Sequence, residues 1–198
     1  MEEPLLNLFI SNKMIRTILL RILFIKAKLK YRNILFRGWC VIYAFPGCDI
    51  KIGKDTELYS SFSSNMLGLY QRCILVARYG GKIEIGENCG ISGSTIYSWE
   101  SIKIGNYTRV GANCKIIDND FHPLELRYRH KALNKEHARR APIVIGDDCF
   151  IGMNSIILKG TTLGNNVIVG AGSVVHGTFP DNCIIAGNPA KIVKMLDE

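Results

Sequence analysis

The chain has 198 residues, of which 47% are hydrophobic and 21% charged, with a formal net charge of +8 at pH 7. This length and composition are those of a globular protein with one or two domains, and they exclude a disordered or fibrous chain. The positive charge is concentrated in residues 1–40 and 123–142 while the rest is slightly acidic, so we expect no general nucleic-acid surface and no nucleic-acid partner.

Residues 1–40 are predicted to form an N-terminal helical arm, with helix over residues 5–37. This stretch is rich in Leu, Ile and Phe, but basic residues interrupt it, so no uncharged run reaches the ~18 residues of a membrane span. It also lacks the apolar core and small-residue cleavage site of a signal peptide. Two interpretations remain open: a helix packed on the coil or on a neighbouring subunit, and a basic amphipathic helix on an anionic membrane surface.

Residues 41–187 are predicted to form a solenoid of short strands. Ile50, Ile52 and Leu58 mark a weak first coil, and residues 60–81 depart from the pattern, so we expect irregular turns there. The repeat resumes at Ile83 and slips by one residue around positions 97–101. We interpret the slip as a bulge at a corner of the coil.

A polar insertion interrupts the repeat after I-I-D-N-D-F-H, where His122 falls on the next large inward-type position. Residues 123–142 hold six Lys or Arg, two Glu and few aliphatic residues. Charged side chains do not occupy a core, so this segment is predicted to leave the coil as an excursion loop. Insertions in repeat proteins emerge on one face, which is often the binding face.

Residues 143–179 carry the clearest pattern, a period of six. Large aliphatic residues occupy positions 145, 151, 157, 163, 169 and 175, and mostly small residues follow each of them by four: Cys149, Ser155, Thr161, Val167, Ser173 and then Phe179. Because side chains alternate between the two faces of a strand, residues six apart lie on the same face. In a helix of 3.6 residues per turn they do not. The pattern predicts a parallel β-helix with three hexads per coil and coils about 4.8 Å apart.

The seven cysteines fit this interpretation. Cys89, Cys114 and Cys149 fall on small inward positions, where a thiol behaves as a small hydrophobe. An odd count without paired spacing indicates no disulfide framework and favours a cytoplasmic location, with membrane association left open by the N-terminal arm.

After Val175 the coil is predicted to end at residues 178–181. Asn188 followed by Pro189 has the pattern of an N-cap and a first helical residue. Residues 188–198 are therefore predicted to be a capping element, with a short helix over residues 190–197 that covers the open end of the last coil.

The run I-G-D-D-C-F-I-G-M-N-S-I-I-L-K-G-T-T-L-G-N-N-V-I-V-G-A-G-S-V-V, followed by A-G-N-P-A-K, resembles the hexapeptide-repeat acyltransferases. The resemblance covers about residues 80–194. It implies an all-β fold, a left-handed parallel β-helix, contrary to the usual right-handed crossover. It also implies acetyl-CoA as cosubstrate, no metal, and a homotrimer with sites at the subunit interfaces. The implied activity is O-acetylation of a sugar or polysaccharide precursor, and the alternative is N-acetylation of an amino-sugar nucleotide or an antibiotic-like acceptor.

Acyl transfer from a thioester to an alcohol needs a base, and an imidazole titrates in the right range. By position alone, His122 suits a corner histidine hydrogen-bonded to backbone; the resemblance implies the general base of a direct transfer. Asp118 and Asp120 are expected on the same side, where they either orient the imidazole or are solvated turn carboxylates.

The segment Phe150–Met153 stands where the resembled family has W-I-G-x, which implies that the Met153 N–H stabilises the oxyanion. Phe150 replaces the frequent Trp, so only packing against acceptor or pantetheine remains for it. Lys191 is a candidate for a phosphate contact or a solvated helix end. The resemblance assigns these residues to coenzyme A: Phe150, Gly152, Gly170, Ala171, Ser173, His176, Gly187, Asn188, Pro189 and Lys191.

Two other functions share the coil and fit the sequence less well. A zinc hydratase needs three histidines, and of the four present, two lie in the excursion and His176 is out of register with His122. A non-enzymatic scaffold or ice-binding coil would show a long Thr ladder and no excursion rich in His and Arg.

Overall fold

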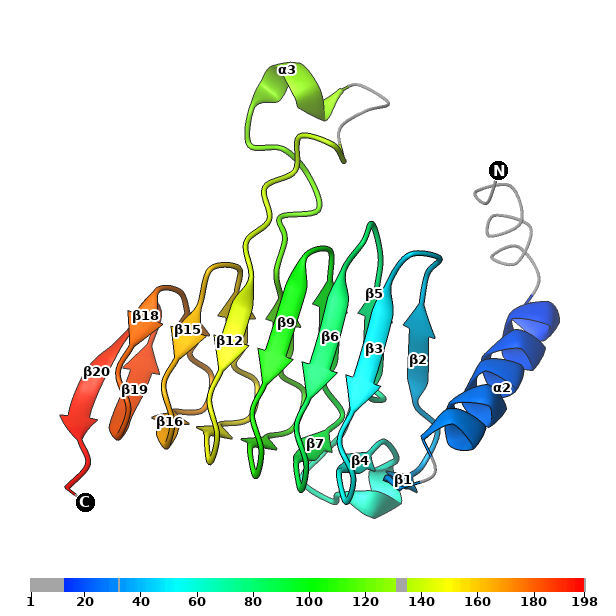
Figure 1. Ribbon diagram of the computed structural model, residues 1–198, viewed down its shortest axis with the longest axis horizontal. Helices are drawn as coiled ribbons and strands as arrows, with labels where there is room; N and C mark the ends of the chain where they lie inside the picture. The colour runs from blue at the N-terminus through cyan, green and yellow to red at the C-terminus, as the bar shows by residue number, and fades with distance from the viewer. Residues whose placement is uncertain (1–12, 32, 131–134, 198) are drawn as a thin grey trace.

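The computed structural model describes residues 13–31, 33–130 and 135–197, and its strands form a three-sided prism (Figure 1). Sheet A contains β1 (Leu35–Arg37), β4 (Glu57–Tyr59), β7 (Gly90–Ser92), β10 (Arg109–Val110), β13 (Phe150–Ile151), β16 (Val167–Val169), β19 (Cys183–Gly187) and β20 (Ala190–Met195). Sheet B contains β2 (Val41–Ala44), β5 (Ile74–Ala77), β8 (Thr95–Ser98), β11 (Lys115–Ile117), β14 (Ile156–Leu158) and β17 (Val174–Val175). Sheet C contains β3 (Asp49–Ile52), β6 (Lys82–Ile85), β9 (Ser101–Ile104), β12 (Ile143–Ile145), β15 (Thr162–Leu163) and β18 (Thr178–Phe179).

From β1 to β19 the chain visits the three sheets in turn, and each strand pairs in parallel with the strand three places away. This is the arrangement of a parallel β-helix, as the repeat predicts. We call the line of turns between sheets A and B the A/B edge (near residues 93, 112, 153 and 171). The line between sheets B and C is the B/C edge (near residues 99, 118, 159 and 176).

The predicted inward positions form the core of the prism. Ile151 lies between Val110 and Val169 in sheet A, and all three are at most 2% exposed. Each such side chain contributes about 1.5–3 kcal/mol by burial. The small inward positions are buried as well, and their polar atoms use backbone carbonyls: Ser155 Oγ donates to Gly170 O at 3.1 Å. Phe179 differs from expectation, because it pairs with Leu163 at a large position.

The structure changes two expectations for the first half of the coil. Residues 60–73 form a loop with one short 3₁₀ helix, η1 (Phe62–Ser64), but Ile74–Ala77 is the regular strand β5 rather than an irregular turn. The register slip near residues 97–101 lies at a corner of the coil, as expected, but it is a turn rather than a β-bulge. Strands β8 and β9 keep regular parallel pairing, so turns absorb the change in residue number.

The N-terminal helix α2 (Lys13–Lys30) lies beside β2 at the first coil, and Phe24 and Ala27 are buried (Figure 1). Residues 5–12 of the predicted helix lie outside the described residues. At its other end the prediction is wrong, because the helix ends at Lys30 and Leu35–Arg37 is strand β1. That segment pairs with β4 and so extends sheet A. No helix within the described ranges has the length and apolar character needed to cross a membrane.

The C-terminal helix predicted over residues 190–197 is also wrong. Ala190–Met195 forms β20, which folds back antiparallel on β19. The β-branched Ile192 and Val193 favour a strand. Strand β19 would otherwise leave an unpaired sheet edge, so pairing with β20 is favourable. The chain end still covers the last coil, as expected, but by a hairpin.

The excursion leaves the prism between β11 and β12, as predicted, and carries the short helix α3 (Leu126–Arg129) (Figure 1). Its two stems pair with each other. Asn119 and Arg140 form an antiparallel bridge, Asp120 N donates to Arg139 O at 3.0 Å, and Ala141 N donates to Asp118 O at 3.0 Å. The residues at its base are therefore held in a defined place.

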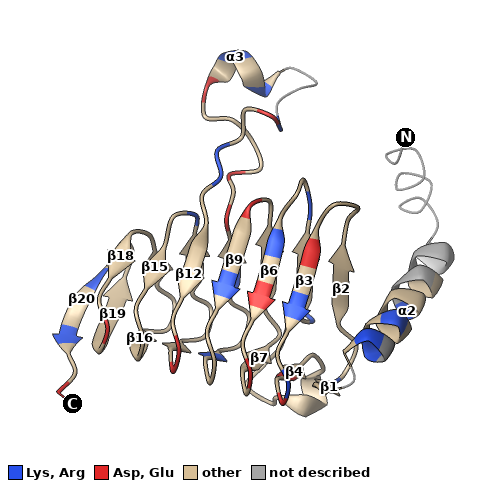
Figure 2. Ribbon diagram, in the orientation of Figure 1, with Lys and Arg blue, Asp and Glu red and all other residues tan. Residues whose placement is uncertain are grey.

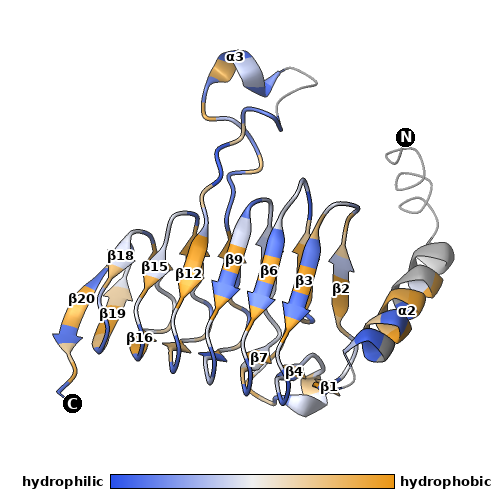
Figure 3. Cartoon of the chain, in the orientation of Figure 1, coloured by the Kyte–Doolittle hydropathy of each residue, from blue (hydrophilic) through white to orange (hydrophobic). Residues whose placement is uncertain are grey.

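The outer faces of sheets B and C differ in character. On sheet C, charged residues such as Lys51, Lys82, Glu84 and Lys103 point outward, and β3, β6 and β9 are the charged, hydrophilic strands of that face (Figures 2 and 3). On sheet B the outward, incompletely buried residues are mostly apolar: Val41, Tyr43, Ile74, Val76, Thr95, Tyr97, Lys115, Ile117, Ile156, Leu158 and Val174. Sheet B thus presents an apolar face along the prism.

Candidate active site

Asp118 lies fully buried at the B/C edge, and its carboxylate is hydrogen-bonded to residues of that same edge. Its carboxylate accepts hydrogen bonds from Ser98 Oγ at 2.6 Å, Trp99 N at 2.7 Å, Glu100 N at 2.9 Å and Asn119 Nδ2 at 3.2 Å. These four donors occupy both oxygens. The contacts favour a structural role for Asp118 over the orienting role expected from the sequence.

Asp120 is placed differently. Its Oδ1 accepts a hydrogen bond from Lys159 Nζ at 2.6 Å, and the two side chains are only 21% and 25% exposed. Its Oδ2 is buried and has no hydrogen-bond donor among the described residues. Because Oδ2 has no donor among these residues, Asp120 keeps hydrogen-bonding capacity that Asp118 lacks.

His122 lies at the base of the excursion and is exposed. Its backbone N donates to Asp120 O at 2.6 Å. The preceding Phe121 has φ of 59° and packs against Tyr97 and Trp99, with ring centroids 5.2 and 5.6 Å away. The aromatic contacts and the paired stems fix the backbone that carries His122, so an accessible imidazole projects from a rigid site.

The oxyanion candidate Met153 lies at the A/B edge. Neighbouring coils approach closely here: a Cβ on Gly111 would lie 2.7 Å from Met153 N, and a Cβ on Gly152 would lie 2.5 Å from Ala171 N. The Met153 N–H donates to no acceptor within the described ranges. Phe150, 49% exposed, lies outward on sheet A between Arg109 and Ile168.

Most residues assigned to coenzyme A gather along this same edge. Gly187 N donates to Ser173 Oγ at 3.1 Å, and a Cβ on Gly170 would lie 2.9 Å from Ala186 Cβ. Ala171, Gly187, Asn188 and Pro189 are exposed, and Lys191 is exposed on β20 rather than at a helix end. Exposed positions without bulky side chains leave backbone accessible to a thin, extended ligand.

His176 does not belong to this group. It follows β17 at the B/C edge, where its Nε2 would lie 3.9 Å from a Cβ on Gly160. His122 is at the same edge, whereas Met153 and Gly170 are at the other. The strands of sheet B, two to four residues long, and the turns that flank them separate the two edges by about 10 Å or more. Within one chain, the predicted base and the predicted oxyanion donor are therefore not brought together.

Sequence reasoning missed the residues that anchor the excursion. Lys159 pairs with Asp120, and Arg140 Nη1 donates to Tyr79 O at 3.3 Å and Trp99 O at 3.2 Å. The repeat gave no signal for Lys159. It stands two residues after Ile157, at the turn position where other coils carry Asp147 and Asn165.

Comparisons with known proteins bear on this site. The family model for the hexapeptide repeat of succinyl-transferase matches residues 142–176. The chain is 32% identical over 171 residues to the putative lipopolysaccharide biosynthesis O-acetyl transferase WbbJ of Escherichia coli (strain K12), covering 83% of this chain and 80% of that protein.

Two solved structures share the fold. The polySia specific acetyltransferase NeuO aligns with a TM-score of 0.65 at 24% identity, over 82% of this chain and 68% of that chain. A mutant of the N-acyltransferase AntD from Bacillus cereus, in complex with dTDP-4-amino-4,6-dideoxyglucose and coenzyme A, aligns with a TM-score of 0.56 at 17% identity, over 87% and 89%. At these identities the likeness establishes the fold alone.

Proposed function

The chain belongs to the hexapeptide-repeat acetyltransferases and is an acyltransferase, and from this premise we propose that it O-acetylates a hydroxyl of a sugar or polysaccharide precursor with acetyl-CoA, on a left-handed coil. The observation that carries the proposal is the 32% identity with a putative lipopolysaccharide O-acetyl transferase over 80% of that protein. N-acetylation has no comparable support, since the AntD likeness is one of fold.

The residues at the A/B edge fit the cosubstrate. Ala171 and Gly172 are exposed, and a Cβ on Gly172 would meet nothing within 4 Å. Gly152, Gly170, Gly187 and Lys191 would hold acetyl-CoA along this edge, where it supplies an activated acetyl thioester. Met153 N–H is an unused donor for the developing oxyanion.

His122 acts on the acceptor in this proposal. Its exposed imidazole accepts the proton of the sugar hydroxyl as that oxygen attacks, and can return the proton to the leaving group. Asp120, whose buried Oδ2 has no donor in the described part of the chain, is the better candidate to orient the ring and stabilise its charged form. No nucleophilic side chain is required for direct transfer.

A homotrimer would complete the site. His122 and Met153 stand on opposite edges of sheet B, and the apolar face between them would be covered by a second copy. A cyclic arrangement of copies brings the B/C edge of one chain to the A/B edge of its neighbour. We therefore infer that the base and the thioester site come from different subunits.

The N-terminal helix supports peripheral membrane contact in the same proposal. Ile18, Ile22 and Ile25 form an exposed stripe on α2, between 43% and 57% exposed, and Arg21 and Lys26 are exposed beside it. Such a helix suits an anionic membrane surface. We propose a cytoplasmic enzyme that approaches membrane-linked acceptors through this stripe.

The test is to incubate purified protein and labelled acetyl-CoA with sugars, sugar nucleotides and aminoglycosides, and to locate the acetyl group by mass spectrometry. His122→Ala should lower turnover by about 10²–10⁴-fold and leave acetyl-CoA affinity nearly intact. His130→Ala, a second exposed histidine of the excursion, should keep most activity. Acetylation at an amine, or an active His122→Ala enzyme, would contradict the proposal.

A further inference from the structure

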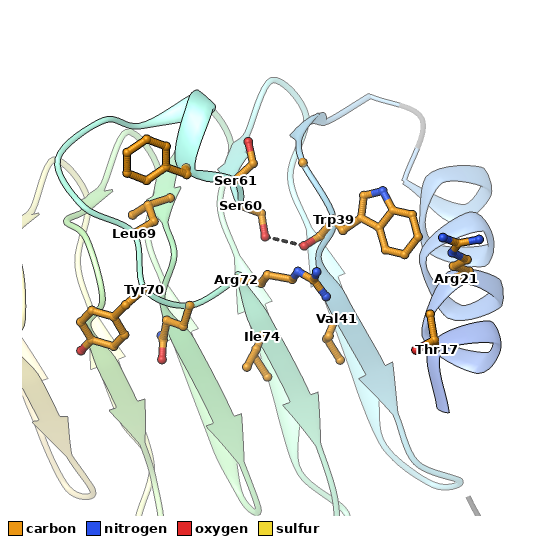
Figure 4. A pocket seen from close by; sticks show the side chains of 13 residues that line it. Thr17, Arg21, Trp39, Val41, Ser60, Ser61, Leu69, Tyr70, Arg72 and Ile74 are labelled. Atoms are coloured by element: carbon orange, nitrogen blue, oxygen red, sulfur yellow. Dashed lines mark hydrogen bonds between the residues drawn. The ribbon is translucent and has the colours of Figure 1, made fainter. Parts of the chain in front are cut away.

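A cavity lies far along the prism from the excursion, between α2, the first strands of sheet B and the loop of residues 60–73 (Figure 4). Its volume is about 940 Å³, within the range of sites for small organic ligands. Arg21 reaches it from α2, Arg72 from the loop, and Trp39 lies between them (Figure 4). The transfer of the acetyl group uses none of these residues, and Arg21 also lies beside the exposed stripe of α2.

The charge of this cavity is unbalanced. The Arg21 and Arg72 guanidinium carbons lie 5.0 and 5.8 Å from the Trp39 ring centroid. None of the thirteen lining residues is acidic, and neither guanidinium has a carboxylate partner in the described part of the chain. By contrast, Arg37 is paired with Glu57 at 2.8 Å. Both cations therefore lack a negative partner among the described residues, and a bound anion would supply one.

The walls of the cavity are held in place without a ligand. Phe24 stacks on Trp39 with ring centroids 5.9 Å apart. Ser60 Oγ donates to Trp39 O at 2.6 Å and accepts from Cys73 N at 2.8 Å, which ties the loop to β2. Gly38 has φ of 113°, and a Cβ there would lie 2.8 Å from Ser61. A pre-formed site loses less free energy to ordering when a ligand binds.

We propose that this cavity binds a phosphate-bearing ligand, with Arg21 and Arg72 as the groups that contact the phosphate and Trp39 as the surface for an attached organic group. A phosphate monoester carries about −1.5 to −2 charge and three acceptor oxygens, which matches two guanidiniums better than a single carboxylate does. The apolar Phe62 and Leu69 also line the cavity. The phosphate therefore has two sources, a soluble sugar phosphate and a lipid phosphate headgroup.

The chain provides its own reporter. Of its two tryptophans, Trp39 is 37% exposed in the cavity and Trp99 is 4% exposed in the coil. Intrinsic fluorescence of the full chain is titrated at low salt with glucose 1-phosphate, with glucose as the uncharged control. Phosphatidylcholine vesicles with and without phosphatidylglycerol form the lipid arm. Arg21→Gln and Arg72→Gln are compared with Arg37→Gln, which removes an arginine over the Tyr59 ring outside the cavity.

Saturable binding of glucose 1-phosphate, weakened about tenfold or more by Arg21→Gln and by Arg72→Gln but not by Arg37→Gln, supports a soluble ligand. Vesicle binding with the same dependence supports a lipid phosphate. Vesicle binding that is unchanged in Arg21→Gln and Arg72→Gln but lost in Ile22→Gln is due to the exposed stripe of α2. If glucose 1-phosphate also fails to bind, this result overturns the proposal. Failure of both probes also overturns it. None of these readouts needs acetyl transfer, so they are independent of the proposed activity.

Discussion

Replacing Asp118 by Ala tests whether this carboxylate builds the B/C edge or serves the histidine. The side chain is fully buried and accepts from four donors, two of them the backbone N–H groups of Trp99 and Glu100. Ser98 Oγ can rotate to another acceptor, but the two amides cannot. Each buried donor left unsatisfied costs about 1–3 kcal/mol, so the expected loss is about 2–6 kcal/mol.

A loss of that size is a large part of the 5–15 kcal/mol that usually stabilises a domain. At about 2–4 °C per kcal/mol for a chain of this length, Tm should fall by about 4–24 °C. The assay is thermal unfolding followed by circular dichroism at matched protein concentration. Asp181→Ala is the control, because Asp181 also accepts from a backbone amide, Asn165 N at 2.8 Å, but is exposed; exposed substitutions change stability by about 0.5 kcal/mol.

The reasoning fails if Asp118→Ala melts within about 2 °C of the wild type while its turnover falls as far as that of His122→Ala. That result would return Asp118 to the orienting role. A variant that is destabilised as expected, but whose folded fraction keeps its turnover, would leave Asp120 as the carboxylate that acts on His122.

Three other predictions follow from the contacts. Burial raises the pKa of the Cys149 thiol from 9.0 to about 11, so the unfolded chain releases this proton first as the pH rises. The free energy of unfolding, measured with urea, should therefore fall by up to about 3 kcal/mol between pH 9 and 11. Cys149→Ala should flatten that slope. Lys159→Met should cost about 1–3 kcal/mol, less than for a fully buried pair because Asp120 is partly exposed; an unchanged Tm would contradict this. Deleting residues 190–198 should expose the edge of β19 and cause aggregation, measured by light scattering. A truncated chain that does not aggregate would show that this edge needs no cover.

The six-residue period predicted the core because a parallel coil repeats one local environment. Each residue pairs with the residue one coil away, so Ile145, Ile151 and Ile157 report the register of every neighbouring coil. The excursion was predictable for the same reason, since a run of charged residues has no place in that environment. These inferences needed no knowledge of contacts between distant segments.

The errors lie where the repeat ends. Leu35–Arg37 and Ala190–Met195 were assigned to helices on local signals, and both are strands of sheet A. Each adds to the edge of a sheet that the rest of the coil presents, and an unpaired edge outweighs a weak helix propensity. His176 was assigned with Gly170 by the resemblance, and within one chain the two residues lie on opposite edges of sheet B.

The sequence by itself determined the winding of this chain, because a side chain every six residues must face either the core or water. It also determined that His122 stands where the winding is interrupted. Only the tertiary structure decided what surrounds that histidine. Asp118 accepts its hydrogen bonds from residues at the B/C edge, Asp120 pairs with Lys159, and Met153 lies at the opposite edge of sheet B. These residues are distant along the chain. Their relative positions depend on the length of each turn, and the six-residue period does not specify that length.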